Sequence, residues 1–494
     1  MDEINKKMAK GVTWMVAFKM VERSIGLVST IILARLLVPE DFGLVAMATA
    51  FLGMLLLLTS FSFDVVLIQK QDAERHLYDT AWTFNVIFSL TLSVIVGFSA
   101  IPLAEFYDEV RLENILYVFS LSTFFGGFSN IGPVAFRKEM QFHKEFFFSL
   151  AKKLISFSVT MILAFTLKSY WALVWGTFAG RFFEVLLSYK VHPYRPRFCL
   201  TGRKELFGFS FWLFFNNMIF FAYNRSADFI IGKVLGSHAL GVYSISYEVA
   251  SLPTTELVAP INRAVLPGYS KMSHDLLLIR QGFINVLSVI ALCAIPAGVG
   301  IALVADSMVV VVLGEKWIET IPLIQMLAIS GVFVALQTNV GPLLMAMGRP
   351  QYLTFMALFH VFFLFLPMLV FFLDKDGIKG VAESYLYSNL IILPINFFIV
   401  SRIIKLKILS ILSVLWRPFL SVFLMVGSVM YRPDVMIDDI DMQLVNLFFD
   451  IVYGAFVYSV GILFFLWMSK YPEGAEKFVM KKLKVNHYFR AQHD

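Results

Sequence analysis

Charged residues are scarce in this 494-residue chain, at 15%, and cysteine is nearly absent, with two residues. Hydrophobic residues make up 59% of the sequence, more than the roughly one half that is usual in soluble domains. This composition indicates a chain whose main solvent is lipid. Cys199 lies in a basic loop and Cys293 in an apolar run, which excludes a disulfide framework and a cysteine metal site.

Motifs for metal binding and ATP hydrolysis are also absent from the sequence. The eight histidines form no HxxxH or HExxH pair, so we expect no metal and no other cofactor. No GxxxxGK[ST] loop occurs, so transport would draw on gradients, with coupling to H+ or Na+ left open. The net charge of +6 is dispersed among short loops, which argues against nucleic acid as a partner.

Apolar segments long enough to cross a bilayer recur along the whole sequence. A span needs about 20 mostly apolar residues, and fourteen such runs predict an all-α polytopic membrane protein with about 14 transmembrane helices. Lys19, Glu22 and Arg23 in the first run are atypical of a cleaved signal peptide. The runs are 12–34, 42–63, 80–102, 114–134, 148–167, 170–189, 206–231, 240–266, 283–304, 321–347, 352–373, 380–400, 411–430 and 444–468.

Basic residues are unevenly distributed between the two sets of loops. If the N-terminus is cytoplasmic, the inner loops hold most of the Lys and Arg, as at Arg137, Arg195 and Lys405. The opposite loops carry acidic residues such as Glu109 and Asp439. The positive-inside rule therefore predicts that both termini are cytoplasmic, in a bacterial inner membrane.

Two short motifs recur in the same order, which predicts an internal duplication. Residues 34–44 are similar to 232–242, at an offset of 198 (241 minus 43), and 130–133 match 339–342, at an offset of 209 (339 minus 130). Because six helices separate the copies, both halves begin on the same side and would be related by an axis along the membrane normal. The predicted division is a six-helix lobe in 1–204, a second in 205–407, and a helix pair with a basic tail in 408–494.

The first of these motifs resembles a known family. Residues 33–48, LARLLVPEDFGLVAMA, resemble the signature of the polysaccharide transporter family, in its colanic and teichuronic acid exporter branch, and residues 228–247 resemble it again. The resemblance covers the first twelve predicted helices. It implies the fold of the multidrug, oligosaccharidyl-lipid and polysaccharide exporters, with two six-helix lobes in a V around a central cavity. It also implies a polyprenyl-diphosphate oligosaccharide as the substrate.

Charges inside the predicted spans are the candidate substrate contacts, because an ionisable group at bilayer depth costs about 2.5–3.5 kcal/mol. A diphosphate needs cations, and guanidinium groups suit phosphate oxygens. We therefore predict that Arg23 and Arg225 bind the diphosphate, with Lys19 as a weaker candidate. The spacing of Lys19 with Glu22, and of Arg225 with Asp228, equally predicts intrahelical ion pairs, and this alternative stays open.

Carboxylates in the same spans are candidates for ion coupling. They are Glu22, Asp228, Glu248, Glu256 and Glu383. Glu248 and Glu256 are eight residues apart, about two helical turns, so we expect both on one helix face.

Glycine and proline at the end of the fourth and tenth runs predict hinges. Gly132 and Pro133 recur as Gly341 and Pro342, and proline removes a helix hydrogen bond while glycine adds freedom. A packing kink without motion is the alternative.

Other intramembrane charges fit structural roles better. Arg181 and Glu184 are spaced to pair within one helix, and Lys152 is interpreted as a positive-inside anchor.

The function that these observations favour is a flippase that moves a lipid-linked oligosaccharide by alternating access, without catalysis of its own. Its expected partners are membrane lipid, the polyprenyl-diphosphate oligosaccharide and a polysaccharide polymerase complex. Two alternatives are an ion-coupled exporter of drugs or other small molecules with the same fold, and a membrane glycosyltransferase or polymerase. The basic residues of the first run argue against the first alternative, and the short external loop after that run argues against the second.

Overall fold

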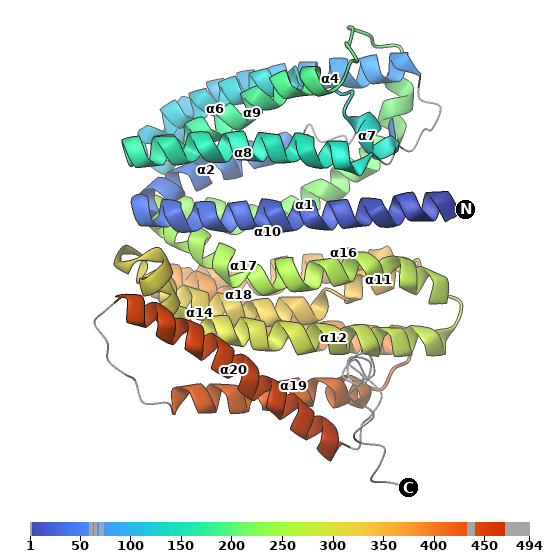
Figure 1. Cartoon of the computed structure of the whole chain (residues 1–494), viewed down its shortest axis with the longest axis vertical. Helices are drawn as coiled ribbons and strands as arrows, with labels where there is room; N and C mark the ends of the chain where they lie inside the picture. Colours follow the sequence, from blue (N-terminus) through green and yellow to red (C-terminus); the bar gives the residue numbers. More distant parts are fainter. Residues whose placement is uncertain are drawn as a thin grey trace. The chain divides into compact units, whose positions relative to one another are not determined.

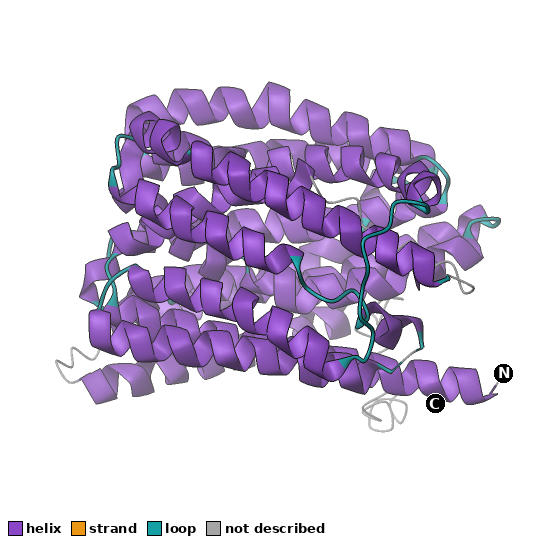
Figure 2. Ribbon diagram, turned by 90° about the horizontal axis from the view of Figure 1, so that it is seen from above, coloured by secondary structure: helices purple, strands orange, loops and turns teal. Residues whose placement is uncertain are grey.

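The computed structural model shows a helical protein, with short loops between the helices (Figure 2). It describes residues 2–58, 63, 67–68, 74–139, 141–431 and 440–469, and it gives the backbone alone for 2–18, 58, 203–224, 259–260, 262–264, 267, 350 and 440–442. This confirms the all-α class. Contacts divide the chain into two compact units, unit 1 (Met1–Val242) and unit 2 (Tyr243–Asp494). The division of the sequence at 204 and 407 follows the repeats instead and stays a prediction.

Unit 1 consists of long helices that run beside one another (Figure 1). Its last helix, α10, is two helices that meet at Gly236, where the backbone is non-helical with φ 81°. A positive φ of this size favours glycine, so the chain turns there and a new helix starts. The helices are α1 (Asp2–Leu36), α2 (Pro39–Leu58), α4 (Arg75–Phe98), α5 (Ala100–Tyr107), α6 (Arg111–Gly127), α7 (Val134–Lys138), α8 (Phe142–Leu167), α9 (Trp171–Val191) and α10 (Arg203–Ala250), whose last residues belong to unit 2.

Unit 2 contains three π-helical segments, a form that is rare and that occurs often at functional sites. The α-helices are α11 (Ala259–Met272), α12 (Leu276–Leu303), α13 (Ala305–Met308), α14 (Thr320–Gln337), α15 (Val340–Ala346), α16 (Pro350–Phe359), α17 (Leu366–Asp376), α18 (Ile378–Ile403), α19 (Ile408–Met430) and α20 (Ile440–Met468). The shorter elements are η1 (Pro253–Val258), η2 (Val309–Leu313), η3 (Glu315–Trp317) and η4 (His360–Phe365).

Ten helices among the described residues are long and apolar enough to cross a membrane. They coincide with ten of the fourteen predicted runs. The other four runs are 12–34, 114–134, 170–189 and 206–231. Runs 12–34 and 206–231 include residues whose side chains are not described. The helix of run 114–134, α6, has only 17 residues. In run 170–189, Arg181 and Glu184 lower the mean hydropathy of α9.

The helices of the two units pack in the same pairwise order. In unit 1, α4 contacts α6, α6 contacts α9, and α8 contacts α9. In unit 2, α12 contacts α14, α14 contacts α18, and α17 contacts α18. The predicted duplication pairs these helices in the same way, so the repeated sequences are accompanied by repeated packing.

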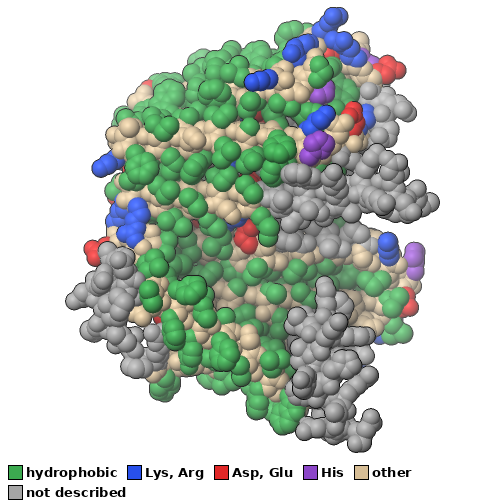
Figure 3. All heavy atoms as spheres, viewed as in Figure 1, with side chains coloured by type: hydrophobic (Ala, Val, Ile, Leu, Met, Phe, Trp, Pro, Cys, Tyr) green, Lys and Arg blue, Asp and Glu red, His purple; other side chains and the backbone are tan. Residues whose placement is uncertain are grey.

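Apolar side chains cover the outer flanks of the helices. Phe98 is 82% exposed and Phe423 is 76% exposed. On the face drawn in Figure 3, hydrophobic side chains cover the flanks of the helices, and most of the charged side chains lie near the helix ends. Water disfavours such a surface, whereas lipid tails are as apolar as the side chains themselves.

Small residues bring α8 and α9 close together. Gly176 and Gly180 on α9 are four residues apart, the small-xxx-small spacing of close helix pairs. Ser156 on α8 donates a hydrogen bond to the Gly176 carbonyl at 2.9 Å. A Cβ on Gly176 would lie 1.8 Å from Oγ1 of Thr160 and 3.2 Å from its Cα. The contact therefore has no room for a methyl group.

We expect Gly176→Ala to lower the stability of the protein by about 1–3 kcal/mol, the usual cost of overpacking. Gly126→Ala is the matched control, because a Cβ on this helical glycine has no neighbour within 4 Å. Thermal unfolding in detergent should show a lower Tm for Gly176→Ala and an equal or higher Tm for Gly126→Ala. Equal Tm values for the two variants would contradict this account of the helix pair.

Candidate functional site

The predicted ion pair of α1 is present. Nζ of Lys19 lies 2.6 Å from Oε2 of Glu22, with side chains that are 58% and 36% exposed. Arg23, four residues after Lys19, is half-buried. Lys19 is therefore neutralised within its own helix, and of these two cations Arg23 is the more buried.

The predicted pair of α10 is also present, but its two members differ in burial. Nη1 of Arg225 lies 2.7 Å from Oδ2 of Asp228. The carboxylate is 8% exposed, whereas the side chain of Arg225 is 54% exposed. Because a guanidinium carries five N–H donors, one carboxylate oxygen does not exhaust its hydrogen bonding. The ion pair and a phosphate contact are therefore compatible at Arg225, and its role in substrate binding stays a prediction.

The candidate coupling carboxylates of unit 2 lie in different environments. Glu248 on α10 and Glu383 on α18 are half-buried, whereas Glu256 is exposed. The expectation that Glu248 and Glu256 share a helix face assumed continuous α-helix, but α10 ends at Ala250 and Glu256 lies in the π-helical η1. Eight residues there are not two α-helical turns, because a π-helix has more residues per turn. Ion binding by these carboxylates stays a prediction.

Both predicted hinge motifs lie at breaks in the helices. In unit 1, α6 ends at Gly127 and α7 begins after Pro133, and in unit 2 α14 ends at Gln337 and α15 begins at Val340. Pro342 lies in the first turn of α15. The N–H groups of a first turn have no partner within the helix, so a proline there removes no helix hydrogen bond.

The asparagines that precede these prolines form side-chain hydrogen bonds at the helix breaks. Asn130, 5% exposed, donates from Nδ2 to the Tyr194 carbonyl at 2.8 Å and accepts from the Gly132 amide at 2.8 Å. Asn339, 0% exposed, accepts from the Tyr269 hydroxyl at 2.7 Å. It also donates to the carbonyl of Phe283 at 3.1 Å.

The two hinge glycines have different surroundings. A Cβ on Gly132 would lie 2.3 Å from Nδ1 of His192, whereas one on Gly341 would have no neighbour within 4 Å. Packing therefore requires glycine at 132 but not at 341, and motion at either break stays a prediction.

Glu184 on α9 connects two helices. Oε1 of Glu184 lies 2.9 Å from Nζ of Lys152 on α8, and Oε2 lies 3.4 Å from Nη1 of Arg181. The predicted pair of Arg181 with Glu184 is present. Lys152, interpreted from the sequence as an anchor at the membrane surface, makes an interhelical ion pair.

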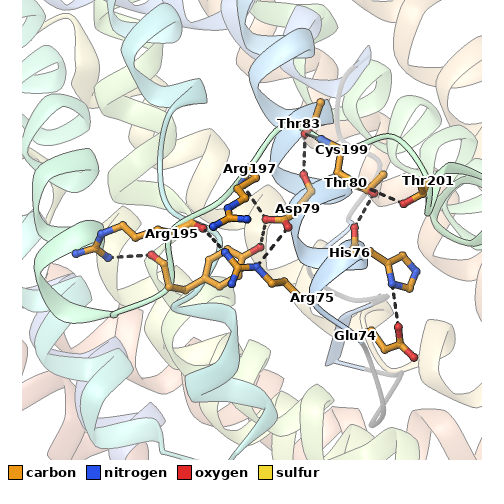
Figure 4. A network of polar contacts seen from close by, with 11 residues as sticks. Glu74, Arg75, His76, Asp79, Thr80, Thr83, Arg195, Arg197, Cys199 and Thr201 are labelled. Carbon is orange, nitrogen blue, oxygen red and sulfur yellow. Dashed lines mark hydrogen bonds and ion pairs between the residues drawn. The ribbon is translucent and has the colours of Figure 1, made fainter.

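The segment 192–202, which joins α9 to α10, is fastened along the start of α4 (Figure 4). Asp79, with a side chain that is 9% exposed, is the centre of this contact. Its Oδ1 accepts from the Tyr194 hydroxyl at 2.5 Å and from the Arg197 amide at 2.9 Å. Nε of Arg75 lies 3.6 Å from Oδ2 of the same carboxylate.

Threonines of α4 continue this contact towards α10. Oγ1 of Thr83 accepts from the Cys199 amide at 2.9 Å, and Oγ1 of Thr80 accepts from the Gly202 amide at 3.2 Å. The bond between Cys199 and Thr83 is drawn as a dashed line in Figure 4. Burial and the hydrogen bond to Asp79 raise the pKa of Tyr194 well above its usual value, so its hydroxyl stays a donor. The connection between the two halves of the sequence is therefore an ordered segment up to Gly202.

The sequence analysis did not identify two of the buried charged residues. Asp79 lies one residue before the predicted run 80–102, and its hydrogen-bond partners Tyr194 and Arg197 are more than 100 residues away in the sequence. Arg417, 2% exposed, is the only charged residue of α19. A lone charge in an apolar run is a signal that would have identified Arg417, whereas no local pattern identifies Asp79.

Comparison with known families and proteins gives a consistent result. Residues 32–322 match the family described as polysaccharide biosynthesis protein. The teichuronic acid biosynthesis protein TuaB of Bacillus subtilis is 24% identical over 85% of this chain and 86% of its own length. The lipopolysaccharide biosynthesis protein WzxC of Escherichia coli is 25% identical over 84% of this chain and 85% of its own length.

Solved structures with a similar fold are membrane transporters. The lipid II flippase MurJ, in an inward closed conformation, has a TM-score of 0.74 at 13% identity, covering 92% of this chain and 99% of its own. An inward-facing multidrug transporter of the MATE family has a TM-score of 0.62 at 13% identity, covering 80% of this chain and 98% of its own. At these identities the similarity establishes the fold alone.

We expect Asp79→Ala to release the segment 192–202 from α4. A hydrogen bond to a charged group contributes about 1.5–3 kcal/mol, so exchange of the Arg197 amide should accelerate roughly ten- to hundredfold. Hydrogen exchange of the protein in detergent measures this rate. Thr91→Ala is the matched control, because Oγ1 of Thr91 donates only within α4, to the carbonyl of Ile87. Unchanged exchange in Asp79→Ala would show that this contact does not hold the segment.

Proposed function

This chain belongs to the polysaccharide biosynthesis protein family, and from that premise we propose that it is a flippase for a polyprenyl-diphosphate-linked oligosaccharide. The observation that carries the proposal is the extent of the family match, which runs over residues 32–322, from α1 to α14. The relatives TuaB and WzxC are named for teichuronic acid and lipopolysaccharide biosynthesis. The translocated unit would serve synthesis of such a cell-surface polysaccharide.

The chain is a multi-pass membrane protein with a transporter-like fold. The finer arrangement that we propose is fourteen transmembrane helices, twelve of them in two lobes around a central cavity, with α19 and α20 as an additional pair. Both termini then lie in the cytoplasm of a bacterial cell, because the predicted inner loops carry the excess of Lys and Arg.

Translocation proceeds by alternating access in this proposal. The diphosphate and its sugars enter the cavity while the prenyl tail remains in lipid, and rocking of the lobes exposes the cavity to the outside. Arg23 on α1 and Arg225 on α10 compensate the phosphate charges, because guanidinium groups form strong, directional bonds with phosphate oxygens. The chain positions and neutralises its substrate and makes no covalent bond, which is the role of a transporter and not of an enzyme.

The membrane potential supplies a driving force in this scheme. Moving a net charge of −2 outward across a membrane with an inside-negative potential of 100 mV releases roughly 4–5 kcal/mol, provided that no compensating cation travels with it. Coupling to H+ or Na+ at a carboxylate such as Glu248 or Glu383 would change this balance.

We expect the double variant Arg23→Ala, Arg225→Ala to flip a fluorescent polyprenyl-diphosphate oligosaccharide at least about tenfold more slowly than the wild type in proteoliposomes. The reason is the loss of charged hydrogen bonds worth about 1.5–3 kcal/mol each. Arg402→Ala is the matched control, since this exposed arginine lies over the ring of Phe398 at the end of α18. An unchanged rate in a folded double variant would exclude these arginines as the diphosphate site.

A further variant separates phosphate binding from simple neutralisation of Asp228. If Arg225 serves only to neutralise this buried carboxylate, then Arg225→Ala together with Asp228→Asn removes both charges and should restore the flipping rate. If Arg225 binds phosphate, the paired variant stays as slow as Arg225→Ala alone. Recovery of the wild-type rate would therefore contradict the site proposed at Arg225.

A further inference from the structure

Two helix starts meet within unit 1 in a reciprocal contact. Pro39 begins α2, and Ser237 follows the kink at Gly236 in α10. A Cβ on Gly43 would lie 1.7 Å from the carbonyl oxygen of Ser237, and a Cβ on Gly241 would lie 1.8 Å from that of Pro39. Ser237 follows Pro39 by 198 positions (237 minus 39), as Gly241 follows Gly43 (241 minus 43), and this is the offset of the repeat. The first turn of each helix therefore packs on its own repeat copy, and only glycine permits the approach.

The same contact contains an ionisable pair with the same offset. Nδ1 of His238 lies 2.6 Å from Oε1 of Glu40, and the two side chains are 43% and 38% exposed. Pro39, Glu40 and Gly43 of one copy thus correspond to Ser237, His238 and Gly241 of the other. We call these six residues the glycine junction. Glu40 and His238 form its one ionisable pair.

The carboxylates beside this pair, those of Asp41 and Glu109, make hydrogen bonds or ion pairs with other groups. Asp41 accepts hydrogen bonds from the amides of Val38 at 3.2 Å and Tyr170 at 3.1 Å. Glu109 pairs with Arg111 at 2.7 Å, and Ser237 donates to Glu109 at 3.5 Å.

The hydrogen bond from Arg111 lowers the pKa of Glu109, so this carboxylate keeps its charge near neutral pH. With Glu40 and Asp41, three carboxylates then face the single guanidinium of Arg111. With all four groups ionised the local charge is −2 (1 minus 3), and protonation of His238 reduces it to −1.

We propose that Glu40 and His238 form a proton-operated latch of the glycine junction. An imidazole gains its charge between pH 8 and pH 5, and the positive ring then adds a Coulombic attraction to the carboxylate of Glu40. Protonation of His238 therefore holds the first turn of α2 against the corresponding turn after Gly236, and deprotonation loosens the contact. Because the pair is partly exposed, the proton comes from the solution on that side of the membrane.

The consequence for transport rests on the proposed function. In alternating access, the two copies of the repeat must separate in one of the two states, and this contact joins them at corresponding helix starts. Acid on the side of the glycine junction then slows opening there and favours the state in which the contact is made.

The test is a distance measurement across the glycine junction that needs no substrate. Spin labels are placed at Val38→Cys and Val234→Cys, which are 44% and 60% exposed, in a background of Cys199→Ser and Cys293→Ser. In lipid nanodiscs, the ratio of short to long distances should rise about fivefold from pH 8.0 to pH 5.5. This is the factor expected for the attraction of two unit charges about 4 Å apart in water.

Three variants make the result specific. His238→Gln keeps a donor for Glu40 but cannot be protonated, and Glu40→Gln keeps an acceptor without charge, so both should show no pH response. His143→Gln, at an exposed histidine of α8 outside the glycine junction, should respond as the wild type does.

Identical wild-type distances at both pH values, or a pH response that survives in His238→Gln, would overturn the latch. Because no oligosaccharide is present, this outcome is independent of the flipping assay.

Discussion

Ionised side chains inside a bilayer need a compensating partner, and this constraint accounts for much of the described structure. Such a group costs about 2.5–3.5 kcal/mol at the centre of a span. Lys19 with Glu22, and Arg225 with Asp228, meet the constraint within one helix. Glu184 meets it between two helices, where it fastens α8 to α9. Asp228 is the buried member of its pair, at 8% exposed, whereas apolar side chains such as Phe423 lie on the surface.

A transporter must combine this compensation with motion. The structure shows ordered connections beside breaks in the helices: the segment 192–202 is bonded to α4, whereas α6 and α14 are interrupted after Gly127 and Gln337. Buried asparagines bond across both interruptions. Rigid bundles joined at a few defined places are the usual construction of proteins that change shape by rocking.

The sequence predicted most of the fold because its signals are local. Each apolar run falls on helix in the described residues, and the asparagine, glycine and proline motifs fall at helix breaks. The ion pairs at a spacing of three residues also follow from a local signal. The sequence predicted them as the alternative to diphosphate binding. The contact of Asp79 with Tyr194 was not predictable, because it depends on how segments far apart in the sequence meet. The pair of Glu40 with His238 was missed although both motifs were recognised, since a repeat aligns residues without showing that they touch.

The central claim is that this chain moves a lipid-linked, anionic oligosaccharide, and the charge of that substrate provides the most direct test. Wild-type protein in proteoliposomes should flip a short-chain polyprenyl-diphosphate oligosaccharide, and liposomes without protein should not. An inside-negative potential should accelerate outward flipping, because each elementary charge contributes about 2.3 kcal/mol per 100 mV. The same rate at zero and at inside-negative potential would contradict electrogenic transport. No flipping under any potential or ion gradient would contradict the account as a whole.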